Sequence, residues 1–160
     1  VLILSIVGVI FLSTVSPAQL PSVEKVEPPL STRGADIIDA RKRPVLLRGV
    51  NWFGMETETQ APHGLWARDY KEMLAQIKGL GYNVIRLPYS VKALRGTEIS
   101  GVNFEIGSNR DLQGKKPIEV MDAVIQEAGR QGLMILLDSH RLNNQRIPEL
   151  WYGDGFTEED

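Results

Sequence analysis

The sequence predicts the α/β fold class, with strands and helices that alternate along the chain around a parallel sheet. Two segments, residues 83–90 and 133–138, are largely apolar over the length of a strand that is buried on both faces. Residues 67–80 and 117–131 place apolar side chains three and four positions apart, which is typical of amphipathic helices. The strand ends turn polar or aromatic in the segments GVNWFG, IRLPYS and LLDSHR. We expect these ends to face a cleft.

Two arrangements of a parallel sheet fit this alternation, a doubly wound open sheet and a closed β/α barrel. A doubly wound sheet that binds a nucleotide would carry a glycine-rich turn such as G-x-G-x-x-G after its first strand, and residues 49–66 contain none. A barrel explains the polar strand ends better, because its active site is built from residues at the C-terminal ends of several strands. We therefore expect a (β/α)8 TIM barrel, of which only an N-terminal hairpin and about the first three βα units are present.

Composition excludes several classes of protein. The chain has 160 residues, of which 42% are hydrophobic and 24% charged, as in ordinary globular domains. The net charge is -2 and the basic residues are dispersed, so we expect no nucleic-acid partner. There is no cysteine, which rules out thiolate catalysis, disulfides and cysteine-based zinc sites.

The N-terminal segment, residues 1–18, is expected to be a signal peptide, and the protein to be secreted and extracellular. The apolar run Val1–Leu12 has signal-peptide length, and Ser16 and Ala18 supply the small residues of a cleavage site. Polar residues interrupt the run too early for a spanning helix, so we expect no stable membrane association after cleavage, with an uncleaved anchor as the alternative. The chain begins with valine and lacks a basic n-region, which indicates a fragment.

A proline-rich linker is expected to follow over residues 19–33, which hold three prolines and little periodicity. The folded domain is then residues 34–160. Its first feature is expected to be a pair of short strands around a polar turn at residues 40–44, with the second strand at residues 45–50. This hairpin would introduce the parallel sheet.

The helices are bounded by recognisable start and stop residues. The first is expected over residues 67–80, and the second begins at Pro117 and closes at Gly132. A polar, glycine-rich loop is expected between them, over residues 90–116. Thr157, which is followed by acidic residues, has the features that open a further helix.

Two polar residues of the strands are candidates for chemistry. Arg86 lies in an apolar strand, where an unpaired guanidinium would be costly to bury, so it requires an anion nearby. A structural carboxylate could supply that anion, and His140 could likewise be a structural histidine. Aromatic residues follow the strands, where core packing does not require them and flat rings would suit sugar faces, although any single one could be packing: Trp52, Trp66, Tyr89, Trp151 and Tyr152.

Six segments in order resemble the N-terminal part of secreted bacterial endoglucanases of glycoside hydrolase family 5. They are LRGVNWFG, HGLWARDYKEML, GLGYNVIRLPYS, DLQG, LLDSHR and ELWYGDGFTEED, and together they span roughly residues 34–160. Members of this family are retaining β-glycosidases with a (β/α)8 barrel. The resemblance therefore implies the barrel closure that the strand ends favour.

The resemblance implies roles for individual residues. Arg86 matches the arginine that keeps the nucleophilic carboxylate ionised, and His140 matches the histidine that contacts the sugar at the cleavage point. Trp66 matches a cleft tryptophan, with His63 beside it. Asp138 matches a structural acid at a strand end. Substrate-binding residues are thus expected to be Trp66, His63, Tyr89 and Trp151.

The two catalytic glutamates of a retaining mechanism, about 5 to 5.5 Å apart, match nothing in this sequence and are expected beyond residue 160. Glu56, Glu58, Glu149 and Asp154 are the available carboxylates, and none occupies a position that the family uses for catalysis. We reject them as catalysts.

The leading hypothesis is hydrolysis of internal β-1,4-glucosidic bonds in cellulose or related β-glucans by a monomeric enzyme. The chain alone is expected to be inactive. The partner is then a β-glucan polysaccharide or oligosaccharide, with no cofactor and no metal, since two histidines and no cysteine make a poor metal site. Two alternatives remain, another β-glycanase of the family acting on mannan or mixed-linkage glucan, and a carbohydrate-binding pseudoenzyme without catalytic glutamates.

Overall fold

The computed structural model describes residues 25–148 and 150–159. The expected signal peptide, the first part of the expected linker, and Glu149 lie outside the described residues. Strands and helices follow one another in this order: β1 (Ser31–Arg33), β2 (Asp36–Ile38), β3 (Gly49–Asn51), α1 (Tyr70–Gly79), β4 (Val84–Ser90), α2 (Val91–Leu94), the 3-10 helix η1 (Gly107–Leu112), α3 (Pro117–Arg130) and β5 (Met134–Arg141).

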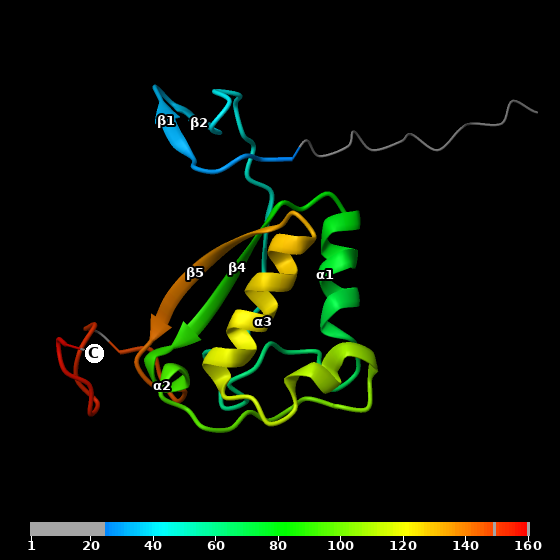
Figure 1. The fold of residues 1–160 in the computed structure, drawn as a ribbon. Coiled ribbons are helices and arrows are strands. Elements are labelled where there is room, and N and C mark those ends of the chain that lie inside the picture. Colours follow the sequence, from blue (N-terminus) through cyan, green and yellow to red (C-terminus); the bar gives the residue numbers. More distant parts are fainter. Residues whose placement is uncertain (1–24, 149, 160) are drawn as a thin grey trace, which may run out of the picture.

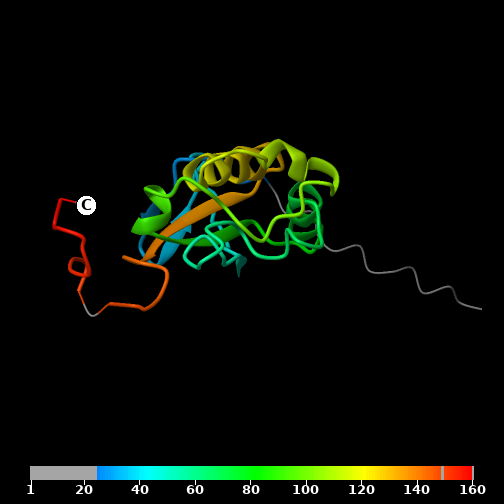
Figure 2. The ribbon, with the colours of Figure 1, turned by 90° about the horizontal axis from the view of Figure 1, so that it is seen from below.

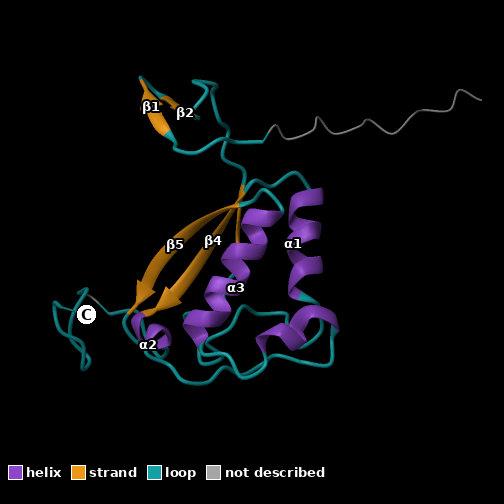
Figure 3. Cartoon of the chain, in the orientation of Figure 1, coloured by secondary structure: helices purple, strands orange, loops and turns teal. Residues whose placement is uncertain are grey.

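A three-stranded parallel sheet in the order β3-β4-β5 forms the centre of the fold. Helices α1 and α3 cover one face of this sheet (Figures 1 and 2). Each helix lies between two parallel strands in the sequence, which is the βαβ arrangement expected from the alternating pattern. The 3-10 helix and α2 lie toward the end of the sheet where β4 and β5 end (Figure 3). The C-terminal strand ends are therefore surrounded by loops.

The hairpin that precedes the sheet differs from the expectation. Strands β1 and β2 pair antiparallel, with Ser31 opposite Ile38, so the hairpin includes residues assigned to the linker. Gly34 has φ +62°, a conformation that a two-residue hairpin turn requires and that glycine adopts without strain. The expected second strand, residues 45–50, becomes a strand only from Gly49 onward. The tight turn at Gly34 therefore determined the pairing.

The polar turn that we expected at residues 40–44 is present, and it is compact. The buried Asp39 accepts hydrogen bonds from the backbone N–H groups of Arg41 (2.9 Å) and Arg43 (3.0 Å). The Arg43 guanidinium also donates to Asp39, at 2.6 Å for Nη2, and this bond, its largest influence, lowers the pKa of the Asp39 carboxyl. Residues 39–43 are thus folded onto one carboxylate.

Helix α1 begins three residues later than expected because Asp69 caps it. The Asp69 carboxylate accepts the backbone N–H groups of Lys71 (2.7 Å) and Glu72 (3.0 Å), which satisfies two of the free donors at the helix start. Asp69 itself has extended backbone angles, so the preceding residues are excluded from the helix. The helix stops before Gly81, whose φ of +87° ends it as predicted.

Helix α3 begins at Pro117 and ends at Arg130, close to the predicted bounds. The loop expected over residues 90–116 is not structureless, since it contains α2 and η1. The further helix expected at Thr157 is absent from the described residues 157–159. The backbone N–H of Glu159 does donate to Thr157 Oγ1, at 3.3 Å, as it would in a helix cap.

The hydrophobic core lies between the helices and the covered face of the sheet. Ile85 and Leu87 of β4 are fully buried there against Leu74, Val120 and Val124 of the two long helices. Burying side chains of this size is worth about 1.5–3 kcal/mol each.

Strand β5 is covered less completely than β4. Leu136 is 56% exposed and Leu137 is 47% exposed. Among the described residues, β5 pairs only with β4, so one of its edges has no strand beside it. None of the helices in the described part of the chain is long and apolar enough to cross a membrane.

Candidate active site

The C-terminal ends of the three parallel strands bring polar side chains onto one face of the sheet. In the register, Asn51 of β3 lies opposite Arg86 of β4, and Arg86 lies opposite Leu136 of β5. Because side chains alternate along a strand, Asp138 and His140 share a face with Leu136 and Arg86. Two strands that are far apart in the sequence thus place these side chains together, as the strand-end pattern predicted.

Arg86 is the centre of this group. Its Nη2 donates a hydrogen bond to Asp138 Oδ2 and lies 3.2 Å from His140 Nδ1, while Nη1 donates to Asn51 Oδ1 at 3.4 Å. His140 Nδ1 in turn lies 3.0 Å from Asp138 Oδ2. The anion that Arg86 requires is therefore a strand-end carboxylate, which agrees with the structural role expected for Asp138.

The group remains open to further ligands. The side chains of Arg86, Asp138 and His140 are 35%, 27% and 30% exposed. A guanidinium has five N–H donors, and the hydrogen bonds of Arg86 to other residues that the structure describes use only Nη1 and Nη2. A positive charge held on a partly open surface, with donors to spare, can bind and orient an incoming carboxylate.

A second group consists of aromatic rings that follow β3. The His63 ring contacts Phe53, with centroids 4.7 Å apart, and Trp66, with centroids 5.4 Å apart, both edge to face. Phe53 is 52% exposed and Trp66 is 53% exposed. The His63 Nε2 lies 3.1 Å from Thr57 Oγ1, which fixes the ring orientation. Exposed rings side by side form an apolar surface of the kind that sugar rings stack on.

Trp52 does not belong to this surface, contrary to the expectation for aromatics after the strands. It is 5% exposed and is part of the hydrophobic core. Its indole Nε1 donates to the His63 carbonyl oxygen at 2.8 Å, and its backbone N–H donates to the Arg86 carbonyl oxygen at 3.0 Å. Through these two hydrogen bonds, the buried Trp52 connects the backbone at His63, in the aromatic group, to β4.

Tyr89 and Trp151 have different surroundings. Tyr89 packs against the hydrophobic core and shares the helix-covered face with Ile85 and Leu87, so the structure separates it from Arg86 and His140. The substrate-binding role expected for Tyr89 stays a prediction. Trp151 is 72% exposed. It lines a cavity of about 310 Å³ together with seven other described residues: Val91, Ser139, His140, Arg141, Leu142, Pro148 and Leu150.

Two of the carboxylates that we rejected as catalysts, Glu56 and Asp154, have structural contacts. Glu56 is 5% exposed and accepts the backbone N–H of Gly54 at 2.7 Å. Asp154 pairs with Arg146 at 2.5 Å and accepts from Asn143 at 3.2 Å. The described residues contain no group of three or more histidine, aspartate or glutamate side chains that could hold a metal ion.

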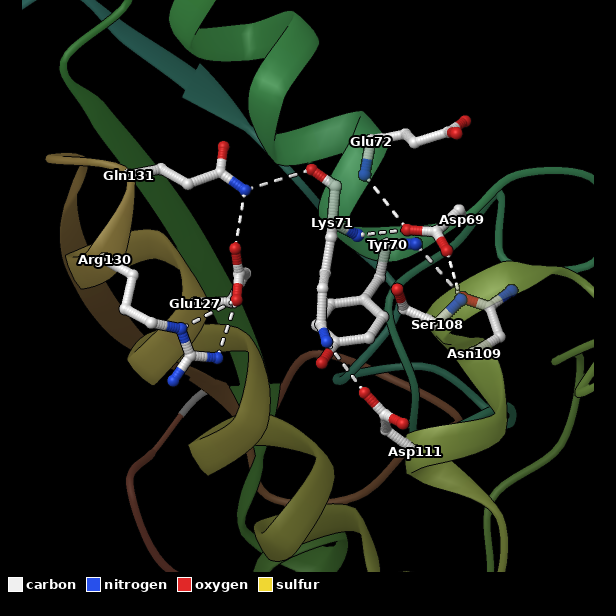
Figure 4. A network of polar contacts seen from close by, with 10 residues as sticks. All are labelled: Asp69, Tyr70, Lys71, Glu72, Ser108, Asn109, Asp111, Glu127, Arg130 and Gln131. Atoms are coloured by element: carbon white, nitrogen blue, oxygen red, sulfur yellow. Dashed lines mark hydrogen bonds and ion pairs between the residues drawn. The ribbon is translucent and has the colours of Figure 1, made fainter.

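A polar network joins α1, η1 and α3 (Figure 4). Burial acts to raise the pKa of Asp69, but hydrogen bonds from the backbone N–H groups of Ser108, Glu72 and Lys71 outweigh it, so the pKa lies below its usual value. The hydrogen bond to Asp111 raises the pKa of Lys71. Hence Asp69 and Lys71 are both charged at neutral pH.

Glu127 holds the other side of this network. The Gln131 side chain donates to Glu127 at 2.8 Å and to the Lys71 carbonyl oxygen at 3.1 Å. The bond from Gln131, followed by the ion pair with Arg130, lowers the pKa of Glu127. Helices α1 and α3 are therefore joined by charged and amide groups in addition to their apolar contacts.

Sequence reasoning missed three residues of this region. Phe53 directly follows Trp52, and the alternation of a strand end predicts opposite directions for the two rings, which was a usable signal. Asn51 also ends a strand, and a polar residue there could have been grouped with Arg86. Asn109, in a polar loop, carried no local signal, because its role depends on segments 40 residues away.

Comparisons with known proteins agree with this geometry. The model of the family Cellulase (glycosyl hydrolase family 5) matches residues 38–160. An endoglucanase of Paenibacillus polymyxa is 41% identical over 127 residues, which are 79% of this chain and 32% of the relative. The major extracellular endoglucanase of Xanthomonas campestris pv. campestris is 41% identical over 122 residues, which are 76% of this chain and 25% of the relative.

Solved structures give the same result. The catalytic domain of the major endoglucanase from Xanthomonas campestris has a TM-score of 0.75 and 38% identity, and the match covers 82% of this chain and 38% of that domain. An endocellulase from Pyrococcus horikoshii in complex with cellotetraose has a TM-score of 0.73 and 40% identity, covering 82% and 36%.

The chain thus spans about a third or less of the curated relatives it matches, and the predicted fold class, part of a TIM barrel, is confirmed. The predicted resemblance is also confirmed, since the family model covers more than half of the chain. A parallel sheet with polar strand ends, a covering layer of helices and this similarity lead to one conclusion: the chain belongs to glycosyl hydrolase family 5.

Proposed function

We propose that the protein carrying this chain hydrolyses internal β-1,4-glucosidic bonds in cellulose or related β-glucans. The observation that supports this most directly is the Arg86, Asp138 and His140 group at the strand ends of a family 5 domain. In this proposal Arg86 keeps a nucleophilic carboxylate ionised, and His140 contacts the sugar at the cleavage point. Asp138 holds both side chains in place.

The reaction is a retaining hydrolysis with two glutamates, both contributed by residues beyond 160. One glutamic acid protonates the leaving oxygen, and the other attacks the anomeric carbon to form a glycosyl-enzyme, which water then hydrolyses. The open N–H donors of Arg86 support this step, because hydrogen bonds to a carboxylate lower its pKa and keep it ionised for attack. No cofactor takes part.

Substrate binding is assigned to Trp66, His63 and Trp151, with Phe53 added. The Phe53, His63 and Trp66 rings offer a platform for sugar faces, and Trp151 lines the cavity beside His140. The cellotetraose complex of the Pyrococcus horikoshii relative supports an oligosaccharide ligand. Tyr89 stays a predicted substrate contact, and its partly buried side chain packs against the core.

Secretion and the monomeric state complete the proposal. The name of the Xanthomonas campestris relative, a major extracellular endoglucanase, supports export of this protein. A cleavable signal peptide over residues 1–18 would direct it, leaving a soluble monomer that acts on extracellular polysaccharide.

The experiment is hydrolysis by the full-length protein of four soluble substrates, derived from cellulose, mannan, mixed-linkage glucan and xylan. Cleavage of the cellulose derivative with the highest kcat/KM, and initial release of the β-anomer detected by proton NMR, is the expected result. Faster cleavage of the mannan or mixed-linkage glucan derivative would show that this polysaccharide is the preferred substrate and would leave the proposed retaining mechanism unchanged. Binding of cellotetraose without any cleavage would show a carbohydrate-binding pseudoenzyme instead.

A further inference from the structure

We infer that Asn109 is a positioning residue that holds Trp66 in place for sugar binding. This inference rests on the proposed function, since it requires Trp66 to contact the substrate. Asn109 lies in η1, 43 positions from Trp66 in the sequence, and its side chain makes hydrogen bonds to backbone groups around the tryptophan. It acts through the backbone that carries the tryptophan.

The Asn109 side chain holds the backbone on both sides of Trp66. Its Nδ2 donates to the carbonyl oxygen of Leu65, immediately before the tryptophan, at 3.0 Å. The same Nδ2 donates to the carbonyl oxygen of Arg68, two residues after it, at 2.9 Å. Asn109 is fully buried, at 0% exposure, so water cannot easily replace these bonds. The Trp66 backbone is thus clamped by one amide group.

The same amide also joins this clamp to its neighbours. Asn109 Oδ1 accepts the backbone N–H of Tyr70, the first residue of α1, at 3.0 Å. Its Nδ2 lies 3.2 Å from the carbonyl oxygen of Asn103, and the Asn103 backbone N–H donates to the Leu65 carbonyl oxygen at 3.0 Å. An asparagine presents two N–H donors and a carbonyl acceptor in one plane, so its two donors are shared among the three carbonyl oxygens while its oxygen accepts the Tyr70 N–H.

A second contact fixes η1 against the start of α1. The Asp69 carboxylate accepts the backbone N–H of Ser108, next to Asn109, while it also caps α1 (Figure 4). Gly107 lies so close that a β-carbon there would overlap the Asp69 carboxylate, and its φ is +46°. Contacts with Asp69 at the start of α1 therefore hold the segment that carries Asn109 in place.

Trp66 depends on this clamp because its ring has little support of its own. The ring is 53% exposed, and among the described residues its aromatic contact is with His63, edge to face. Gly101 lies beside the ring, and a β-carbon at that position would be 4.0 Å from the indole. The direction of the ring is hence determined mainly by the backbone at residues 65–68. A small shift there would move the ring away from a bound sugar.

The test uses the full-length protein and the substitution Asn109→Ala, with cello-oligosaccharides as substrates. Alanine removes the side-chain donor from the Arg68 carbonyl oxygen and leaves the Leu65 carbonyl oxygen with only the Asn103 backbone N–H, so the loop relaxes. We expect KM for the oligosaccharides to rise about fivefold while kcat changes less than about twofold, since only binding through Trp66 is lost. Asn109→Ala should add no further effect in a Trp66→Ala background, because the residue acts through that ring.

Asn83→Ala is the matched control. Asn83 is also a buried asparagine, at 4% exposure, and it also bridges backbone groups, accepting from Arg48 N–H at 2.7 Å and donating to the Leu46 carbonyl oxygen at 2.8 Å. Asn83 directly precedes β4 at its N-terminal end, whereas the candidate active site lies at the C-terminal ends of the strands. We expect it to lower the free energy of unfolding as Asn109→Ala does, with KM unchanged.

An unchanged KM in Asn109→Ala, or an equal rise in the Trp66→Ala background, would overturn the inference and leave the proposed function intact. If Trp66→Ala itself leaves KM unchanged for every β-glycan, the inference fails together with the assignment of Trp66 to substrate binding, while hydrolysis of the β-glucan by the unaltered protein still decides the proposed function. If Asn109→Ala does not fold, Asn109→Ser is used in its place, because serine keeps a small hydrogen-bond donor and acceptor. Its KM is then compared with that of the wild type and, in the Trp66→Ala background, with that of Trp66→Ala alone.

Discussion

The guanidinium of Arg86, on β4, donates a hydrogen bond to the carboxylate of Asp138, on β5, two positions beyond the residue that Arg86 faces in the register. The pair spans adjacent parallel strands at their C-terminal ends, and His140 Nδ1 lies within 3.2 Å of both side chains. Asp138 thus neutralises part of the charge of Arg86 and fixes its plane. The donors that remain define where a further carboxylate would be bound.

Replacing Arg86 with lysine is expected to lower turnover much more than ground-state binding. Lysine keeps the charge but loses the planar fork that reaches Asn51 and Asp138 together. We expect kcat to fall at least about a hundredfold with KM within about threefold, measured by steady-state kinetics on a soluble cello-oligosaccharide. Arg130→Lys, at the ion pair with Glu127, is the control and should leave kcat unchanged. Unchanged turnover with a weakened fold would make Arg86 purely structural.

Asp69 should make the stability of the full-length protein depend on pH at the acid end. Its pKa in the folded state lies below the ordinary value of 3.8, so the stabilisation is complete above that value and is lost as the pH falls through the folded pKa. Asp69→Ala should lower the free energy of unfolding by about 1–2 kcal/mol at pH 7, through the lost helix cap. The difference from wild type should shrink below about pH 4.

Urea unfolding at several pH values measures this difference. Asp122→Ala, an exposed acid on α3 that caps nothing, serves as the control and should shift stability by less than about 0.5 kcal/mol. A difference between wild type and Asp69→Ala that stayed constant down to about pH 2.5 would contradict a charged role for Asp69.

Cleavage of the exported precursor is expected between Ala18 and Gln19. Ser16 and Ala18 are the small residues that follow most closely on the apolar run, which is the pattern that signal peptidase requires. N-terminal sequencing of protein from the culture medium measures the position. A mature chain that still began within Val1–Leu12 would indicate a membrane anchor.

Residues 1–160 expressed alone are expected to lack glycosidase activity and to unfold without a cooperative transition. Leu136 and Leu137 are about half exposed, and one edge of β5 has no strand beside it in the described residues. Thermal unfolding and cellulose hydrolysis measure both properties. Hydrolysis that disappears in Asp154→Asn would show that a carboxylate we assign to structure is a catalyst.

Much of this fold could be read from local sequence. The apolar runs of β4 and β5, the helical spacing of α1 and α3, and the stop at Gly81 depend on nearby residues, so periodicity and capping rules located them. The polar strand ends were visible for the same reason. The bounds of α1 were less accurate, because the cap at Asp69 excluded the residues before it.

The sequence by itself determined which residues end the strands, and with them Arg86 and His140. Only the tertiary structure decided which strand-end residues face the cleft. Side chains alternate between the two faces of a strand, and the helices that pack on one face determine which of these side chains are buried. Tyr89 and Trp52 lie toward the helices and the core, whereas Phe53 and Trp66 are exposed. The clamp by Asn109 joins segments 40 residues apart, and such contacts exist only once the chain has folded.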